Sequence, residues 1–248
     1  MTRIENRDNL LTDPMTVEQK LWEAHLRLQT LYGEQELISR REPMRELIST
    51  VLSHRTTHAN EEEAYWRMFE KFGTWEGIRD APYEELVKAL SPAQFPEPKA
   101  AYIQKILTLI FKERGEANID FLKEMSLEEG LTWLYSLPGV GLKTAALVLL
   151  FNFHKPVLPV DTHVHRVTQR LGIIGSKITP DKAHPVLLSL LPKEPKVLFN
   201  FHKHFYWHGQ RVCKWAEPKC SQCPLPNICK WYQEHRATNK SENIPADN

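Results

Sequence analysis

The chain has 248 residues, of which 42% are hydrophobic and 25% are charged, an ordinary composition for one large or two modest globular domains. The formal net charge of +1 excludes a protein that is basic over its whole surface, although one face can still bind phosphate. No apolar run is long enough to span a bilayer, and the N-terminus lacks a signal-peptide core. We therefore expect a soluble intracellular protein without a membrane partner.

Helical patterns begin near the N-terminus. Thr16 and Gln19 form a capping box, and apolar residues follow at helical spacing until Gly33 ends the helix. Pro43 is a good first-turn residue for a second helix, which the polar stretch 53–58 ends. Both segments therefore predict amphipathic helices.

The same pattern continues along the rest of the chain, interrupted by a proline-rich loop at 91–98. Convincing alternation of period two, which would indicate strands, is absent, so the predicted fold is all-α. Further helices are expected at 59–72, 83–90, 99–114, from the Ser126–Glu129 capping box to Leu137, from Leu142, from Asp161 or Thr162 to Leu171, and at 181–191 and 196–211.

A glycine turn joins two of these helices at Pro138-Gly139-Val140-Gly141. Glycine allows a close approach by another molecule, and the backbone N–H groups that open the next helix point outward with the helix dipole behind them. This arrangement suits a nucleic-acid phosphate. The alternative is a plain tight turn between packed helices.

Lys143 stands in the first turn of the helix that follows, where a cation opposes the helix dipole. The dipole and partial burial should both lower its pKa and make the neutral amine available as a nucleophile. Asp161 begins a later helix after an apolar run, so it is expected to cap that helix and to act on a bound sugar. A solvated lysine and a purely structural cap are the alternatives.

All four cysteines lie close together, with the spacing C-x6-C-x2-C-x5-C, at Cys213, Cys220, Cys223 and Cys229. Four thiolates within so short a segment can close around one metal centre, and there are too few cysteines for a secreted disulfide scaffold. Zinc and an iron–sulfur cluster both accept four cysteine ligands. The spacing therefore favours a metal but leaves its identity open.

These motifs together resemble endonuclease III, the family of helix-hairpin-helix DNA glycosylases with a [4Fe–4S] cluster. LPGVGLKTA at 137–145, VDTHVHR at 160–166, HG at 208–209 and the cysteine array stand in the same order and at nearly the same spacing. The resemblance covers roughly residues 17–236, and the N-terminal half matches less well.

The resemblance implies two helical domains with flexible ends. Residues 36–154 would form a six-helix barrel, and residues 17–35 and 155–236 would form the domain that holds the [4Fe–4S] cluster. Residues 1–16 and 237–248 would be flexible tails. The protein would be a monomer acting in the cytoplasm or at the nucleoid.

The resemblance also implies a bifunctional DNA glycosylase with AP lyase activity in base excision repair. Its partner would be double-stranded DNA with damaged bases, oxidised pyrimidines by default, or abasic sites. Enzymes of this kind flip the base out of the duplex. Lys143 would attack C1′ of the deoxyribose, and the Schiff base would permit β-elimination, with Asp161 assisting. The adenine-glycosylase branch lacks the lysine and carries an acidic residue where this chain has Thr50.

The expected DNA-contacting loops depart from the family. Arg55 stands where the family has a Gln that fills the gap left by the flipped base, and His58 replaces an Asp. Phe95 lies in a second loop that is expected to probe the DNA. Its side chain is expected to act as a wedge in the base stack. The loop between Cys213 and Cys220 carries Lys214 and Lys219. It is either a further phosphate contact or an ordinary solvated loop. DNA contacts are expected at Gly139, Val140, Gly141, Arg55, Phe95, His163, Arg166, Lys214 and Lys219.

Two other functions stay open on the sequence. One is a lyase for abasic sites that removes few bases. The other is a damage-sensing DNA-binding protein that has lost catalysis, although a pure binding protein has no need of both Lys143 and Asp161.

Overall fold

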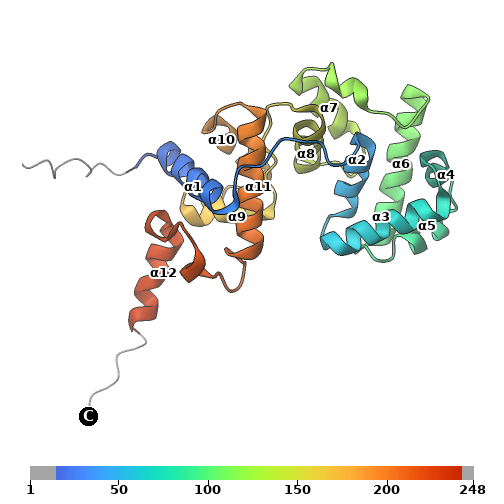
Figure 1. The fold of residues 1–248 in the computed structure, drawn as a ribbon. Helices are drawn as coiled ribbons and strands as arrows, with labels where there is room; N and C mark the ends of the chain where they lie inside the picture. Colours follow the sequence, from blue (N-terminus) through green and yellow to red (C-terminus); the bar gives the residue numbers. More distant parts are fainter. Residues whose placement is uncertain (1–14, 242–248) are drawn as a thin grey trace, which may run out of the picture.

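The computed structural model describes residues 15–241 and shows helices joined by loops, with no strand in that range (Figure 1). The all-α prediction is therefore confirmed. The α-helices are α1 (Val17–Tyr32), α2 (Pro43–Leu52), α3 (His58–Phe72), α4 (Trp75–Arg79), α5 (Tyr83–Ala89), α6 (Pro96–Arg114), α7 (Leu127–Ser136), α8 (Leu142–Phe153), α9 (Thr162–Leu171), α10 (Pro180–Ser189), α11 (Pro195–Arg211) and α12 (Lys230–Ser241).

Several helices begin where polar side chains can satisfy the free N–H groups of the first turn. Thr16 and Ser126 each form the predicted capping box, at the starts of α1 and α7. Glu42 caps α2, because its carboxylate accepts hydrogen bonds from the backbone N–H groups of Met44 at 2.9 Å and Arg45 at 2.6 Å. These local signals explain why the predicted helix starts agree with the structure to within a few residues.

The structure differs from the expected elements in three places. α4 has only five residues, too few for a periodic pattern, and was not predicted. α6 begins at Pro96, before the expected start at Lys99. α12 runs to Ser241, so the predicted flexible tail from residue 237 is wrong for residues 237–241. The tail expected at 1–16 falls mostly outside the described residues, as does 242–248.

The helices gather into two groups (Figure 1). α2 to α8 lie together on one side, and α9 to α12 lie on the other. α1 is close in sequence to α2 but packs against α11, so the chain starts in one group, builds the other and then returns. α8 contacts both α2 and α11 and thus stands at the junction of the groups.

Most of α8 is buried at this junction. Its residues from Thr144 to Leu150 are buried, so only its two ends, at 142–143 and 151–153, present side chains to solvent. On the other side, Phe201 and Phe205 of α11 stack with ring centroids 4.0 Å apart and are fully buried. Burial of such side chains is the main stabilising term in the fold.

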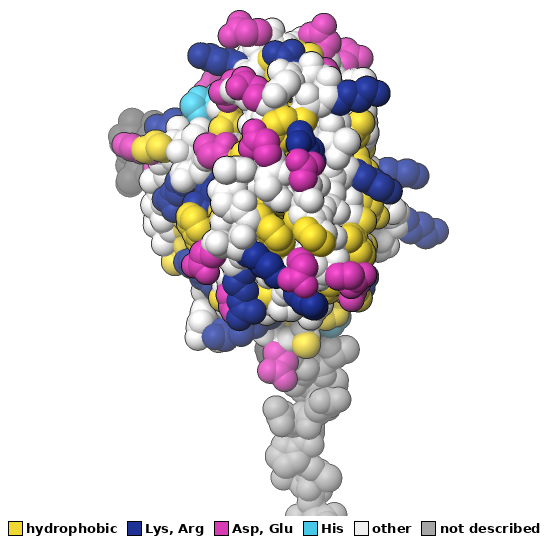
Figure 2. Space-filling model, turned by 90° about the vertical axis from the view of Figure 1, so that its right-hand side faces the viewer, with side chains coloured by type: hydrophobic (Ala, Val, Ile, Leu, Met, Phe, Trp, Pro, Cys, Tyr) yellow, Lys and Arg dark blue, Asp and Glu magenta, His cyan; other side chains and the backbone are white. Residues whose placement is uncertain are grey.

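Charge is mixed on the end of the molecule near α4 and α5. Figure 2 shows Lys and Arg side chains interleaved there with Asp and Glu, and with small apolar patches between them. This face therefore carries no broad area of one sign. In the described range, none of the helices combines the length and apolar character needed to cross a membrane.

Candidate active site

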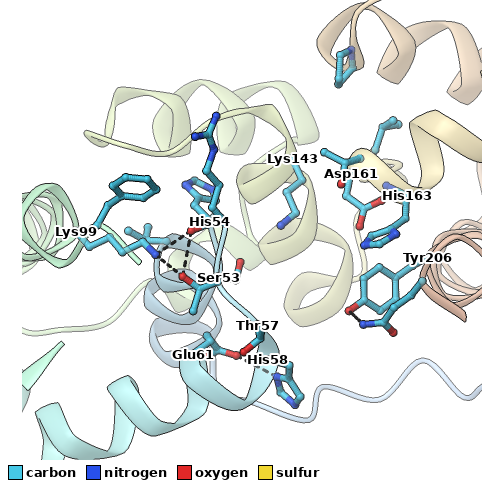
Figure 3. Close-up of a pocket in the computed structure, with 18 of the residues that line it drawn as sticks. Ser53, His54, Thr57, His58, Glu61, Lys99, Lys143, Asp161, His163 and Tyr206 are labelled. Carbon is cyan, nitrogen blue, oxygen red and sulfur yellow. Dashed lines mark hydrogen bonds and ion pairs between the residues drawn. The ribbon is translucent and has the colours of Figure 1, made fainter. Parts of the chain in front are cut away.

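A cleft of about 1160 Å³ runs along the junction of the two helix groups. Its lining includes the loop 53–58, Phe95, Lys143, Asp161 and Tyr206. Figure 3 shows Lys143 on α8 and Asp161 at the start of α9 on opposite sides of an open space, with the loop side chains nearby. Residues that are far apart in the sequence therefore meet around one cavity.

Lys143 extends from the first turn of α8 into this cleft. Gly141 is the N-cap residue and offers no side chain to that turn. Burial lowers the pKa of Lys143, and the carboxylates of Asp161, Glu46 and Glu61 act against that shift. The lowered pKa increases the fraction of neutral amine, the form that can act as a nucleophile.

Asp161 is both a helix cap and a cleft residue. Its Oδ1 accepts hydrogen bonds from the backbone N–H groups of His163 at 2.9 Å and Val164 at 2.8 Å. Since both bonds go to one oxygen, the carboxylate is fixed while Oδ2 stays available for a ligand. Capping and a role in the cleft are thus compatible, as predicted.

Two aromatic side chains support the aspartate. The rings of His163 and Tyr206 meet edge to face with centroids 5.2 Å apart, and both line the cleft beside Asp161 (Figure 3). Burial and the nearby Asp161 carboxylate raise the pKa of Tyr206, so its hydroxyl keeps its proton at neutral pH. The Asp161 side of the cleft is therefore a rigid aromatic wall.

The glycine turn has the conformation that the sequence predicts. Gly139 has φ 77°, and a Cβ there would lie 2.7 Å from the ring of Tyr102, so a larger residue would not fit. Val140 differs from the expectation: its side chain is buried, and its N–H is donated to the carbonyl of Leu137 at 3.2 Å. Gly141 and the uncapped first turn of α8 remain open to an anion.

Lys99 holds the loop at 53–58 in place through hydrogen bonds. Its side chain is buried, and Nζ donates to the carbonyls of Leu52 at 2.7 Å and His54 at 2.9 Å and to Oγ1 of Thr56 at 2.7 Å (Figure 3). Oγ1 of Thr56 also accepts a hydrogen bond from the N–H of Gln94 at 3.1 Å. The ammonium group therefore holds segment 52–56, and Thr56 links that segment to the loop that carries Phe95.

The two expected probing residues stand at the tips of these loops. Arg55 has φ 53° and Phe95 has φ 57°, left-handed angles that are uncommon for residues other than glycine. Both side chains are exposed, and Cζ of Arg55 lies 6.0 Å from the centroid of the Phe95 ring. The strained backbone thus presents a cation and an aromatic ring side by side, as a pair able to enter a base stack.

His58 begins α3 and joins an ionic chain at the edge of the cleft. Its Nδ1 lies 3.2 Å from Oε2 of the buried Glu61, which also accepts a hydrogen bond from Arg41 at 3.2 Å. Arg41 and Arg45 both pair with Glu62. His58 and Arg41 therefore share one oxygen of Glu61, while Glu62 pairs with both arginines.

Arg166 differs from the expected DNA contact. Only 7% of it is exposed, and its guanidinium donates to the carbonyls of Cys213 at 2.9 Å and Gly209 at 2.6 Å, and it lies 3.1 Å from Nδ1 of His163. These bonds engage Nε and Nη2 inside the protein. Arg166 therefore connects the aspartate-bearing helix to the cysteine segment and is buried, not displayed on the surface.

The four cysteines converge on one small cavity between α9, α11 and α12, and none forms a disulfide. Four thiolates that face one space can bind a single metal centre, and both a zinc ion and an iron–sulfur cluster accept four such ligands.

Polar contacts already surround these sulfurs. The guanidinium of Arg170 donates to Sγ of Cys213 at 3.3 Å, and the N–H of Leu225 donates to Sγ of Cys223 at 3.4 Å. Burial raises the pKa of the Cys223 thiol to about 12, so a positive centre is needed to hold it as a thiolate. Lys214 and Lys219 are both exposed on the loop between the first two cysteines, as expected for phosphate contacts.

Several cleft residues were not identified from the sequence. Lys99 looked like an ordinary surface lysine at a helix start, and Tyr206 and Tyr102 fall within regular helical patterns. No local motif marks them, because each acquires its place through contacts across the fold. A lysine inside an otherwise apolar helix face was the one available signal for Lys99.

Comparison with known proteins agrees with this geometry. Residues 48–193 match the HhH-GPD superfamily of base excision DNA repair proteins. Endonuclease III of Thermotoga maritima is 36% identical over 192 residues, which cover 77% of this chain and 84% of that protein. Endonuclease III of Bacillus subtilis is 30% identical over 188 residues, covering 76% and 81%.

Solved structures give the same result. The structure of a trapped endonuclease III–DNA covalent intermediate aligns with a TM-score of 0.77 at 28% identity, covering 90% of this chain and all of that one. A non-covalent endonuclease III–DNA complex aligns equally well. The chain therefore belongs to the HhH-GPD superfamily and is an endonuclease III-like DNA glycosylase with AP lyase activity that acts on double-stranded DNA.

Proposed function

We propose that Lys143 is the nucleophile of this enzyme, that Asp161 assists it, and that the substrates are oxidised or otherwise damaged pyrimidines in duplex DNA. The observation that carries the proposal is the lysine itself. It is desolvated at the open end of a buried helix and faces a fixed carboxylate across a cleft between two helix groups.

The reaction follows from this arrangement. The neutral Nζ of Lys143 attacks C1′ of the deoxyribose, and the electron pair of the glycosidic bond leaves with the base, which takes up a proton. Nζ then loses its own protons as the sugar ring opens to a Schiff base. Removal of a C2′ proton expels the 3′ phosphate, and water finally releases the lysine. Asp161 Oδ2 stabilises positive charge on the sugar as the base departs.

The cleft residues divide between chemistry and DNA binding. The uncapped first turn of α8 and Gly141 would bind a backbone phosphate, and His163 would lie against the flipped nucleotide. Arg55 would fill the gap left by the flipped base, and Phe95 would wedge the neighbouring stack. Lys214 and Lys219 would contact phosphates farther along the duplex.

The cysteines are proposed to hold a [4Fe–4S] cluster, which the convergence of four free thiols on one cavity supports. When bound, the cluster would fix the loop that carries Lys214 and Lys219. Iron analysis with visible absorbance at about 400 nm tests this assignment, and bound zinc in place of iron would contradict it. The proposed domains are 36–154 and 17–35 with 155–236, in a monomer that works at the intracellular chromosome.

The proposal is tested with duplexes that carry an abasic site or a single oxidised pyrimidine. Borohydride reduction should trap a covalent adduct on the abasic duplex, and lesion duplexes should be cut without added alkali. Trapping without removal of any damaged pyrimidine would reduce the function to an AP lyase. Tight binding with neither reaction would indicate a damage-sensing protein.

A further inference from the structure

Behind Lys143 and Asp161 lies a second, smaller cavity of about 170 Å³. It shares Lys143, Asp161, Ser53 and Tyr206 with the large cleft, so the two spaces meet at the lysine. This cavity has room for about six water molecules, each of which takes about 30 Å³ in the liquid. A nucleotide with C1′ at Lys143 would place its backbone in the cleft and a single-ring base in this cavity.

The walls of the small cavity suit a flat ring. Leu147 and Phe151 contribute apolar side chains. On the opposite helix the rings of His202 and Tyr206 are almost parallel, with an interplanar angle of 10° and centroids 6.1 Å apart. Flat bases are held by such aromatic and apolar surfaces, while polar groups at the rim determine which base binds.

Two buried polar side chains in the cavity have unused hydrogen-bonding atoms. Ser49 is 1% exposed, and its Oγ has no hydrogen-bond partner within residues 15–241. His202 is 5% exposed, and its Nδ1 lies 2.9 Å from the carbonyl of Pro159, so Nδ1 carries the proton. Nε2 of the neutral ring is then an acceptor. A buried hydroxyl without a partner, such as that of Ser49, is rare and indicates a missing ligand or water.

Lys203 and Glu46 place opposite charges at the same cavity. The ammonium of Lys203 lies over the rings of Trp207 and Phe199, 4.9 Å and 5.9 Å from their centroids. Burial lowers the pKa of Lys203 and raises the pKa of Glu46, and each group partly offsets the shift of the other. The lysine only donates hydrogen bonds, and the glutamate supplies an acceptor.

We propose that Lys203, Glu46, Ser49 and His202 form a base-reading pocket for rings with an imide edge, in which an N–H lies between two carbonyl groups. This inference rests on the proposed function. Lys203 and Ser49 would donate to the two carbonyl oxygens, and Glu46 or Nε2 of His202 would accept from the N–H. Bases of the uracil and thymine type have this edge, and cytosine-type bases carry an amino group in place of one carbonyl.

The charge of Lys203 favours the carbonyl for two reasons. An amino group facing the ammonium would set donor against donor and leave both unpaired in a buried site. When the glycosidic bond breaks, its electron pair spreads onto the carbonyl oxygens of an imide base, where a nearby cation stabilises it. We thus assign two roles to Lys203: it recognises the carbonyl of the base, and it stabilises the negative charge on the base as the base departs.

The test compares 5-hydroxyuracil with 5-hydroxycytosine, which differ along this edge: the first has a carbonyl at C4 and an N–H at N3, and the second has an amino group at C4 and an acceptor nitrogen at N3. Each is placed opposite guanine in the same duplex, and base release is measured in single turnover after alkali, so that the lyase step does not affect the readout. Wild type should release 5-hydroxyuracil about tenfold faster or more. Lys203→Met should reduce that preference to within about twofold, and Lys196→Met, exposed on the same helix and paired with Glu34, should retain it.

Equal rates for the two bases in wild type, or a preference that survives in Lys203→Met, would overturn the proposal. Glu46→Gln serves as a second variant if Lys203→Met melts early, and it should also lower the preference. Failure of the proposed function has a different signature. In that case wild type would give no borohydride adduct on an abasic duplex, whatever its preference between bases.

Discussion

The segment from α8 to α9 and the loops at 53–58 and 91–95 line the same cleft, yet they are held in place by different means. Lys143 and Asp161 stand at helix N-termini, where backbone geometry fixes them within a few residues of chain. The loops carry Arg55 and Phe95 in left-handed conformations and depend on one buried lysine from α6. Lys143 and Asp161 are positioned by local structure, whereas Arg55 and Phe95 are positioned by long-range contacts.

The largest expected effect comes from removing Lys143, the proposed nucleophile. Lys143→Ala should lower single-turnover base removal by about 10³-fold or more, because no other amine occupies its position. The change leaves α8 intact, since alanine is a good helix former. Thermal melting checks the fold, and a variant that retained base removal with an unchanged lyase step would contradict the role of Lys143.

The next effect separates the two roles of Asp161. Asparagine caps helices about as well as aspartate, so Asp161→Asn should change the free energy of unfolding by less than about 1 kcal/mol. Base removal should still fall about 100-fold, because the negative charge beside the sugar is lost. Asp161→Ala should lose the cap as well. Equal activity of wild type and Asp161→Asn would mean that the residue only caps α9.

A smaller effect on base removal is expected from substitution of Lys99, which holds the loop at 53–58. Lys99→Met removes three hydrogen bonds, to Leu52, His54 and Thr56, and should slow removal of a paired lesion about tenfold. Without these hydrogen bonds, Arg55 and Phe95 can leave their strained backbone conformations. A duplex in which the lesion lies opposite a gap needs no wedge, so the slowing there should be smaller. The same slowing on both duplexes would count against a role in positioning the loops.

Lys99 also predicts a pH dependence. Burial lowers its pKa from 10.5 to about 8, so above about pH 8 the neutral amine has two N–H groups for three acceptors. Removal of a paired lesion should fall there in wild type but not in Lys99→Met. The unfolded chain holds this proton up to about pH 10.5, so wild type should gain stability relative to Lys99→Met between pH 8 and 10.5. If base removal and stability depended on pH in the same way in wild type and Lys99→Met, this prediction would be contradicted.

The smallest effect is expected at Arg55. Arg55→Gln restores the residue type of the related enzymes at the gap-filling position and should change base removal a few-fold, while binding of undamaged duplex stays nearly constant. Gel shift and single-turnover assays on the same oligonucleotides give both quantities. An equal loss of binding and base removal would show that Arg55 acts as a general phosphate contact.

The sequence predicted the helices other than α4 and α12, the turn at Gly139 and the cap at Asp161, because each depends on residues close together in the chain. It did not predict the contacts of Lys99, the inward position of Arg166 or the cavity around Lys203. Those depend on which helices meet, and α11 reaches α8 and α9 only after the chain has folded back. α4 was missed because five residues carry no periodic signal.

The most direct test of the central claim maps the adduct that borohydride traps on an abasic duplex. After nuclease and protease digestion, mass spectrometry should find the reduced sugar remnant on the peptide that contains Lys143. Lys99 and Lys203 lie around the same space and are the internal controls. A remnant on either of these lysines, or no covalent adduct at all, would contradict the assignment of Lys143 as the nucleophile.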